Sequence, residues 1–333
     1  MVYNQGKIKV KYSYSRLNTY ESCGWKYKLT YEDKHYLYTD NLAADLGTLI
    51  HYIEEQIAIN IINHEKINYD KLKEDFININ IPKSSPYDTK GGVYGIKYLK
   101  EKYFEDFYKV NELGQSYDTK TQDYLRTGIY RLEKMINENP SLEIKSVEQY
   151  FQIQFNHFIL NGYIDRILYN KDTGEYSVVD IKTKDHPFRD EDLVTPLQLV
   201  IYSLALESIY GVDPNTVSCI YDLPLCNMQQ KAGTKGFIER GKKKLNKIFS
   251  GIEDKNFTPK PSALCYWCAF SHTNPNQLPE GQNLCPYYSL WKPGGAIKAY
   301  EVANKWEGMD KHDEIMLKFC QKRKDIENFD FDF

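Results

Sequence analysis

The sequence lacks any uninterrupted apolar run of the length that a membrane-spanning helix needs. A bilayer crossing takes roughly 18 or more consecutive apolar residues, and no run in the 333 residues approaches that length. The opening MVYNQGKIKVKYSYS also has no apolar segment of the kind found in secretory signal peptides. We therefore expect an intracellular, cytoplasmic protein without membrane partners.

The chain also lacks a large excess of charge of either sign. With 43 Lys and Arg against 46 Asp and Glu, its net charge of -3 excludes a globally basic protein. DNA enzymes often confine positive charge to one groove, so this balance does not exclude them. RGKKKLNK, from Arg240 to Lys247, is a local candidate for such a groove, and a solvated helix face explains it equally well.

The sequence also gives no sign of repeats, of an ATPase motor or of a disulfide framework. We find no internal repeat and no long low-complexity segment. GFIERGKK approximates a phosphate-binding loop, but Lys243 stands where that loop needs Ser or Thr, so we expect no ATPase motor. The seven cysteines are an odd number, which in an intracellular chain favours thiols or metal ligands over a disulfide framework.

Periodicity predicts helices in the first part of the chain. SYSRLNTYESCGWKYKLTYEDK predicts one helix that begins at Ser13 or Ser15, either of which can cap it. Apolar residues at helical spacing predict a second helix from about Leu42. Residues 69–139 are predicted to be mainly helical, interrupted by a loop at IPKSSPYDTKGG.

The middle of the chain predicts β-structure. Three segments rich in β-branched and aromatic residues are strand candidates: SVEQYFQIQF, FILNGYIDRILYN and EYSVVDIKT. A helical segment, TPLQLVIYSLALESIYG, and a short strand, VSCIYDLPL, follow them. This order predicts an α/β sheet that is at least partly mixed.

The last two of the three strand candidates bring two carboxylates together. If Asp172 and Thr173 form a two-residue turn, Asp165 lies directly opposite Asp180, with Cβ atoms about 5 Å apart. A bulge at Gly174 would shift this register by one residue. Two opposed carboxylates repel each other unless a positive group lies between them, and a divalent metal is the obvious candidate.

The end of the third strand candidate carries a carboxylate beside an ammonium group. Side chains alternate along a strand, so Asp180 and Lys182 point to one face and Ile181 to the other. An exposed ion pair is the common explanation of such a pattern. In the same way, Asp165 and Arg166 could form a surface ion pair.

Five segments, in order, resemble a known nuclease family. SYSRLNTYESCGWKYKL, LGTLIH, GYIDRI, VVDIKT and QLVIY resemble the PD-(D/E)XK nuclease superfamily. They look closest to its RecB/AddB-type branch, which includes the iron–sulfur nucleases of CRISPR spacer acquisition. The resemblance covers about Ser13 to Cys285, and Ile164 stands where the family name has proline.

The resemblance implies a restriction-endonuclease-like fold, with a mixed central sheet flanked by helices. It divides the chain into four parts: N-terminal helices of the nuclease core (1–56), a helical insertion (57–143), the catalytic core (144–258), and a C-terminal cysteine-rich iron–sulfur segment with a tail (259–333).

The resemblance also implies a Mg²⁺ or Mn²⁺ site and assigns roles to seven residues. The metal ligands would be His51, Asp165, Asp180 and the backbone carbonyl of Ile181. Lys182 would lie beside the attacking water. Gln198 and Tyr202 share one face of a helix and would help to hold DNA and orient the lysine. Without the resemblance, an ordinary core histidine and ordinary helix-surface residues would explain His51, Gln198 and Tyr202.

A second group of candidate ligands is cysteine-based. Cys265 and Cys268 form a C-x-x-C pair with Cys285 following, a pattern typical of zinc or iron–sulfur sites. The resemblance supplies Cys23 as the fourth ligand of a [4Fe–4S] cluster, with zinc as the alternative. The long interval before Cys285 leaves His272 or Cys320 as substitutes, while Cys219 and Cys226 look like buried thiols.

The resemblance therefore implies a metal-dependent DNA nuclease of bacterial or phage-like type, acting as an exonuclease on DNA ends or single strands, with a structural [4Fe–4S] cluster. DNA repair and recombination are the expected settings. One alternative is the nuclease subunit of a helicase–nuclease or CRISPR-adaptation complex. The other is a catalytically idle DNA-binding scaffold subunit.

Overall fold

The computed structural model describes residues 10–35, 41–83, 92–111, 114–184, 186–260, 268–272 and Cys285. The chain divides into two compact units. The first, here the core unit, comprises Met1–Tyr14 and Asp40–Asn246, and the second unit comprises Ser15–Thr39 and Lys247–Phe333. Most of the predicted IPKSSPYDTKGG loop and most of the predicted C-terminal segment lie outside the described residues.

The core unit contains a six-stranded mixed sheet, as the sequence predicts. Its strands are β1 (Lys11–Tyr12), β4 (Leu142–Phe155), β5 (Phe158–Asn170), β6 (Tyr176–Ile181), β7 (Ser218–Leu223) and β8 (Met228–Ala232). β5, β6, β7 and β8 are successive neighbours, and both β4 and β1 pair with β5. The β1–β5 and β6–β7 pairs are parallel and the other pairs antiparallel.

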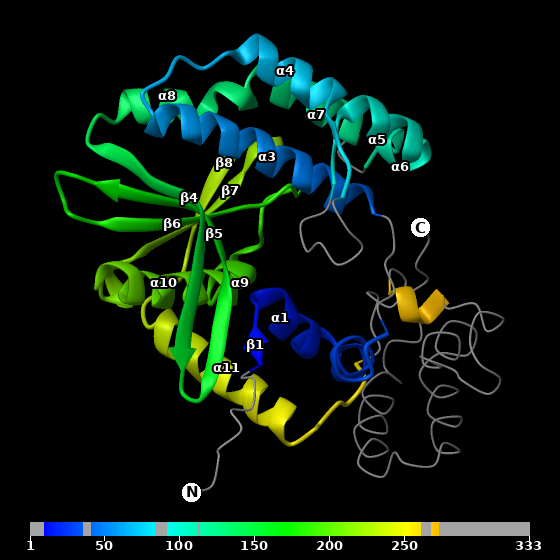
Figure 1. Ribbon diagram of the computed structural model, residues 1–333, viewed down its shortest axis with the longest axis vertical. Helices are drawn as coiled ribbons and strands as arrows, with labels where there is room; N and C mark the ends of the chain where they lie inside the picture. Colours follow the sequence, from blue (N-terminus) through cyan, green and yellow to red (C-terminus); the bar gives the residue numbers. More distant parts are fainter. Residues whose placement is uncertain are drawn as a thin grey trace, which may run out of the picture. The chain divides into compact units, whose positions relative to one another are not determined.

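Helices cover both faces of this sheet (Figure 1). On one side lie α3 (Leu42–Ile62), α4 (Tyr69–Asn78), α5 (Ile96–Lys102), α6 (Phe104–Tyr108), α7 (Tyr117–Arg126) and α8 (Arg131–Glu138). α10 (Leu197–Tyr210) lies on the other side. The unit also contains α9 (Asp190–Leu193), the strand pair β2 (Asn80–Ile81) and β3 (Val93–Tyr94), three 3₁₀ turns at Gly128–Tyr130, Pro214–Thr216 and Pro224–Cys226, and the first part of α11 (Phe237–Glu253).

Helix α3 forms because its apolar residues recur every three or four positions and because Asn41 caps it. The Asn41 side chain accepts a hydrogen bond from the Ala43 backbone N–H at 2.8 Å. The apolar side of α3 is buried in the same cluster as Val179 and Ile181 of β6. Each side chain buried in this way stabilises the fold by about 1.5–3 kcal/mol. The predicted second helix is thus confirmed.

Helix α3 also comes close to the chain just beyond β6. A Cβ atom at Gly47 would lie 3.2 Å from Thr183 Oγ1, tighter than most contacts of this kind. Glycine at this position lets the helix backbone approach the end of the strand.

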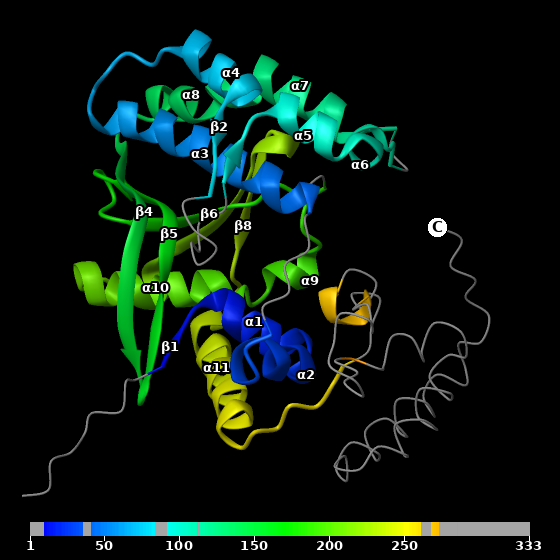
Figure 2. The same ribbon diagram turned by 45° about the vertical axis from the view of Figure 1, so that its right-hand side comes forward.

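The β4–β5 hairpin is the longest feature of the sheet. Asn156 and His157 form its turn, and Asn156 has a φ of 52°, which suits a two-residue hairpin turn. Figure 2 shows the hairpin extending beyond α10, with β1 beside its end. On the other edge of β5, Arg166 pairs with Val179. Continued by one step, this register places Asp165 opposite Asp180, as predicted. The predicted two-residue turn was wrong, because the loop spans residues 171–174 and Gly174 N donates to Asn170 O.

Helix α10 connects the parallel strands β6 and β7 and is part of the core. The stretch Asp190–Tyr210 is long and apolar enough to cross a membrane by composition, but 56% of its most apolar window is buried inside the protein. Leu199, Val200 and Ile201 are almost wholly buried. Gly211 ends the helix with a φ of 68°, which glycine adopts without strain.

The second unit contains α1 (Tyr14–Ser22, whose first residue belongs to the core unit), α2 (Gly24–Tyr27), a π-helical turn (Lys28–Glu32), the end of α11 and a 3₁₀ turn (Ala269–His272). The prediction of one continuous helix was wrong, because the helix breaks at Cys23. Gly24 N donates to Thr258 O, and a Cβ atom at Gly24 would lie 2.8 Å from that oxygen. The close crossing of this later segment explains the interruption.

Candidate functional site

The seven predicted site residues all belong to the core unit and come from four places in its fold. α3 carries His51, β5 carries Asp165, β6 and the residue after it carry Asp180, Ile181 and Lys182, and α10 carries Gln198 and Tyr202. The hairpin register and the β6–α10–β7 connection bring these segments to one end of β6.

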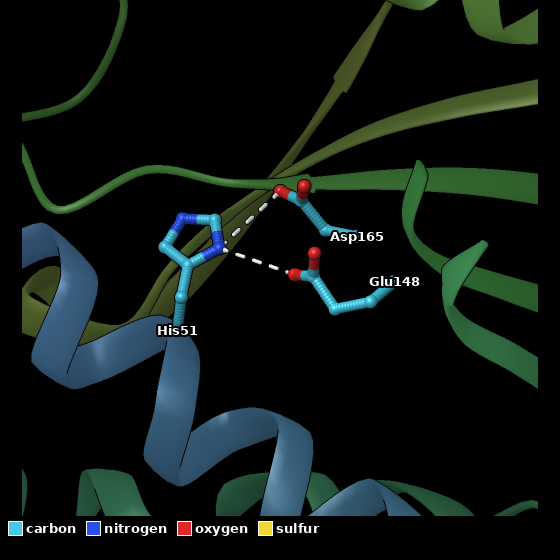
Figure 3. Close-up of side chains that lie close together, drawn as sticks. All are labelled: His51, Glu148 and Asp165. Atoms are coloured by element: carbon cyan, nitrogen blue, oxygen red, sulfur yellow. Dashed lines mark ion pairs between the residues drawn. The ribbon is translucent and has the colours of Figure 1, made fainter. Parts of the chain in front are cut away.

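His51 points at two carboxylates on neighbouring strands (Figure 3). Its Nδ1 atom lies 3.9 Å from Asp165 Oδ2 and 3.8 Å from Glu148 Oε1 of β4. One ligand atom from each of the three residues falls within 4.8 Å of the others. The group can therefore converge on a single cation.

The backbone of Ile181 fixes two members of this group. Its N–H donates to Asp165 Oδ2 at 2.6 Å, and its carbonyl oxygen lies 3.0 Å from His51 Nε2. If Nε2 carries the proton, it donates to that carbonyl, and Nδ1 is left to face the carboxylates. The predicted ligands His51, Asp165 and Ile181 are thus in mutual contact.

The pKa values of this group reflect crowded charge. Burial lowers the pKa of His51, but Asp165 and Glu148 act against burial and raise it to about 9. Burial raises the pKa of Asp165 to about 7, although the neighbouring His51 acts to lower it. Asp180 adds to both shifts. Negative charge is therefore concentrated here, as in sites that bind cations.

Asp180 provides the strongest sign of a cation site. Its side chain is completely buried, and Lys182 Nζ lies 2.6 Å from Oδ2 as an ion pair. Neither carboxylate oxygen has a hydrogen-bond partner with acceptable geometry among the residues that the structure describes. Burying a carboxylate in this way is costly unless a partner satisfies it. With an imidazole, a second carboxylate and a backbone carbonyl nearby, the donor set fits Mg²⁺ or Mn²⁺.

Lys182 begins a chain of hydrogen bonds to α10. Its Nζ donates to Gln198 Oε1 at 3.0 Å, and Gln198 Nε2 donates to the Tyr202 hydroxyl at 2.8 Å. Burial lowers the pKa of Lys182, but Asp180 and Asp165 outweigh burial and raise it. The lysine is therefore held protonated and in one orientation. These contacts connect the two predicted residues of α10 with the two predicted residues at the end of β6.

Glu148 joins this group although it was not among the residues predicted from the sequence. Val147 pairs with Arg166 and Gln149 with Ile164, so Glu148 lies opposite Asp165. Its φ of 44° falls in the left-handed region, which is unusual for a residue other than glycine and is often found at functional sites. Counting outward from the two-residue turn of the hairpin would have found it.

Arg166 is not part of a surface ion pair, because it is almost fully buried. Its guanidinium donates to Glu54 of α3 at 3.0 Å and to Asp222 of β7 at 3.2 Å. Tyr124 of α7 donates to the other Glu54 oxygen at 3.0 Å, and Arg131 of α8 pairs with the other Asp222 oxygen. Two positive and two negative groups thus balance within the core.

This buried network supports the segments that carry the site. Glu54 lies one helical turn after His51, and Arg166 follows Asp165 directly. The backbone N–H of Lys182 donates to the Asp222 carbonyl at 2.8 Å. The network therefore joins the helices of residues 117–138 to the strands beneath the candidate metal ligands.

Three of the four predicted cluster cysteines lie within the described residues, all in the second unit. The sulfur of Cys23 accepts backbone N–H groups of Lys26 and Lys260, each at 3.5 Å. Cys268 and Cys285 pack against a buried pair formed by Leu29 and Phe270. Cys265, Cys320 and the His272 side chain lie outside the described residues.

The two other predicted thiols belong to the core unit. Cys219 of β7 is buried, and burial raises the pKa of its thiol to about 12. Cys226 is partly buried and donates weakly to the Lys184 carbonyl.

A sequence profile of the PD-(D/E)XK nuclease superfamily matches residues 11–273. No significant match was found among curated proteins. The fold is similar to a candidate exonuclease from Eubacterium rectale (TM-score 0.42, 10% identity, 79% of this chain and 88% of that one). It is also similar to the protein SSO0001 (TM-score 0.28, 19% identity, 49% of this chain and 80% of that one). Both TM-scores lie below 0.5, so only the sequence match bears on function.

Proposed function

Since the chain belongs to the PD-(D/E)XK nuclease superfamily, we propose that it is a metal-dependent DNA nuclease acting as an exonuclease on DNA ends or single strands. The observation that carries this proposal is the buried Asp180 carboxylate without hydrogen bonds, beside Lys182 and close to the His51 group. A buried carboxylate without hydrogen bonds is costly even beside one counter-charge, and a bound cation would offset that cost.

The proposed metal ligands are His51, Asp165, Asp180 and the Ile181 carbonyl, joined by Glu148. A bound Mg²⁺ or Mn²⁺ would supply positive charge that polarises the phosphate and activates water. The protein ligands would determine where the cation binds. Ile181 holds Asp165 and His51 through its backbone, and α3 and β5 keep these ligands at one end of β6.

Lys182 is the proposed catalytic lysine. Its ammonium is protonated, fixed by Asp180 and Gln198, and borne on the residue directly after a metal ligand. From there it would stabilise negative charge that develops on the phosphate as the phosphodiester bond is cleaved. Gln198 and Tyr202 would restrict the ammonium to one direction through their own hydrogen bond.

The cysteines support a separate proposal, a structural [4Fe–4S] cluster in the second unit. The sulfur of Cys23 accepts two backbone N–H groups, which fix its position. Cys268 and Cys285 pack against the same pair of apolar residues, and Cys265 would be the fourth ligand. Zinc is the alternative metal. Iron, sulfide and zinc analysis of anaerobically purified protein tests this proposal.

The test of the nuclease proposal is incubation of the purified protein with end-labelled linear and circular DNA, single- and double-stranded. We expect release of label from linear substrates with Mg²⁺ or Mn²⁺ and none with EDTA. Because His51 adds a nitrogen ligand, Mn²⁺ should work at least as well as Mg²⁺, and Ca²⁺ should bind without turnover. Asp180→Asn is the matched inactive control. No cleavage of any substrate by the wild-type protein with either metal would contradict the proposal.

A further inference from the structure

Two tyrosines form an exposed pair on the β4–β5 hairpin. Tyr150 and Tyr163 are direct cross-strand partners, with ring centroids 5.3 Å apart and planes tilted by 59°. They are 42% and 46% exposed. The next residue of β4, Phe151, is buried and packs edge-on against Tyr202 of α10. The tyrosines therefore lie on the solvent face of the hairpin.

The pair lies next to the candidate metal ligands along both strands. Tyr150 follows Glu148 by two residues, and Tyr163 precedes Asp165 by two. At about 3.3 Å per residue, the pair is roughly 7 Å along the strands from those carboxylates. A strand of nucleic acid with one phosphate at the site can therefore reach it with a neighbouring nucleotide.

The strip beyond the tyrosines is polar but uncharged. Gln152 pairs with Asn161 and Gln154 with Ile159, and both glutamines are exposed, in alternation with buried residues of β4. Tyr150 itself donates a hydrogen bond to Gln152 at 3.3 Å. The two tyrosines, the two glutamines and Asn161 thus offer aromatic and amide groups suited to bases. None of these five side chains is a carboxylate that would repel phosphates.

A second tyrosine pair on the same sheet shows a purely structural arrangement. Tyr169 of β5 and Tyr176 of β6 are also cross-strand partners. There the surface is covered, because Tyr210 of α10 stacks on Tyr176 with ring centroids 5.0 Å apart. Tyr169 and Tyr176 thus pack beneath a helix residue, whereas Tyr150 and Tyr163 keep large exposed areas.

We propose that Tyr150 and Tyr163 form a stacking platform for an unpaired nucleobase of the strand being cleaved. This inference rests on the proposed nuclease function and deepens it by naming the substrate class. A base inside a duplex is covered on both faces by its neighbours, so only an unpaired or terminal base can offer a face to the tyrosines. The substrate is therefore a single strand or a frayed end.

The experiment uses the full-length protein, EDTA to prevent cleavage, and a single-stranded DNA oligonucleotide containing 2-aminopurine, whose fluorescence falls on stacking. Anisotropy gives the affinity and quenching reports stacking. Replacing both tyrosines by threonine keeps strand propensity and removes the rings. Because stacking of one base on an aromatic side chain contributes about 1–3 kcal/mol, affinity should fall about 5- to 150-fold and quenching should be lost.

Three variants and two further substrates make the result specific. Phenylalanine at both positions keeps the rings and should bind within about twofold of wild type. Tyr169→Thr removes a covered tyrosine and should change neither affinity nor quenching. Tyr150→Thr alone gives a milder variant if the double variant melts early. An RNA oligonucleotide shows whether the platform accepts either nucleic acid, and a blunt duplex should bind more weakly than both.

Equal affinity and equal quenching for wild type and the threonine variants would overturn the platform, as would the absence of any binding by wild type. The platform and the nuclease proposal fail separately. Wild-type stacking without cleavage in Mn²⁺ would contradict the nuclease alone. Full cleavage with unchanged binding in the threonine variant would contradict the platform alone.

Discussion

Two contacts hold the ammonium group of Lys182, one to the carboxylate of Asp180 and one to the side-chain amide of Gln198. Lys182→Ala should therefore lower cleavage by at least ~10²-fold, since a charge contact in the transition state is worth roughly 3 kcal/mol. The substitution leaves Asp180 without its counter-charge, which should lower the melting temperature. Bound Mn²⁺ would supply positive charge in its place, so it should still bind and should restore the melting temperature of the variant. Lys184→Ala, which removes a charge two residues away, is the control. Turnover near wild type would remove Lys182 from the mechanism.

Glu148 is expected to destabilise the metal-free protein and to strengthen metal binding. Its left-handed backbone costs of order 1–3 kcal/mol, and its carboxylate adds to the negative charge around Asp165. Glu148→Gly should therefore raise the melting temperature of the metal-free protein and weaken Mn²⁺ binding in calorimetry. Gln149→Gly, at the next position, should lower stability by roughly 0.5–1 kcal/mol. Destabilisation by Glu148→Gly with unchanged Mn²⁺ affinity would contradict this account.

Single residues could be placed from the sequence where ionisable side chains alternate along a strand whose pairing register can be counted. Asp165, Asp180 and Lys182 were placed together because a tight turn set the register between their strands. Glu148 was missed because the register of the β4–β5 hairpin was not counted outward from its turn, and its positive φ is not evident from the residue type.

At the scale of elements, α3, β5 and β7 are joined through Arg166. Arg166→Met would leave Glu54 and Asp222 as buried carboxylates with one fewer counter-charge. Breaking a buried pair in this way typically costs about 3–5 kcal/mol, and urea unfolding should show a loss of that size. Arg189→Met is the matched control, since Arg189 pairs with Glu191 at the surface and its loss should leave the unfolding transition almost unchanged. Similar costs for the two variants would show that the network does not support the core.

The elements themselves could be predicted when their periodicity was strong. The long run of buried residues in α3 and the β-branched segments of β5 and β6 are evident from the sequence. The break at Cys23 was not, because it depends on a segment more than 200 residues later crossing at Gly24. The short strands β1 and β8 were missed for a different reason, since two and five residues carry little pattern.

At the scale of the whole molecule, the second unit joins two distant stretches of the chain. Lys260 Nζ donates to the Glu21 carbonyl, and Phe257 stacks on Tyr27. A metal held by Cys23 and the late cysteines would close a very long loop, which for a covalent cross-link of that length stabilises the fold by roughly 4–5 kcal/mol. Such a metal would fasten the two stretches together.

Serine at Cys23 should therefore remove the bound metal and destabilise the fold as much as serine at Cys265, measured by metal content and thermal melting. A brown protein containing iron and sulfide is expected. Cys219→Ala is the control and should change neither metal content nor colour, because Cys219 lies in β7 of the core unit. A colourless protein with one zinc would contradict the iron–sulfur cluster but keep the cross-link. A Cys23 variant with full metal content and unchanged melting would contradict the cross-link itself.

We expect the end of β6 to hold a catalytic divalent cation. Anomalous diffraction from crystals grown with Mn²⁺ tests it most directly, because the signal locates the ion independently of activity. The account predicts a peak bounded by His51, Asp165, Asp180 and the Ile181 carbonyl, and its loss in Asp180→Asn crystals. An ordered site with no manganese peak among these residues, in crystals of protein that cleaves DNA, would contradict it.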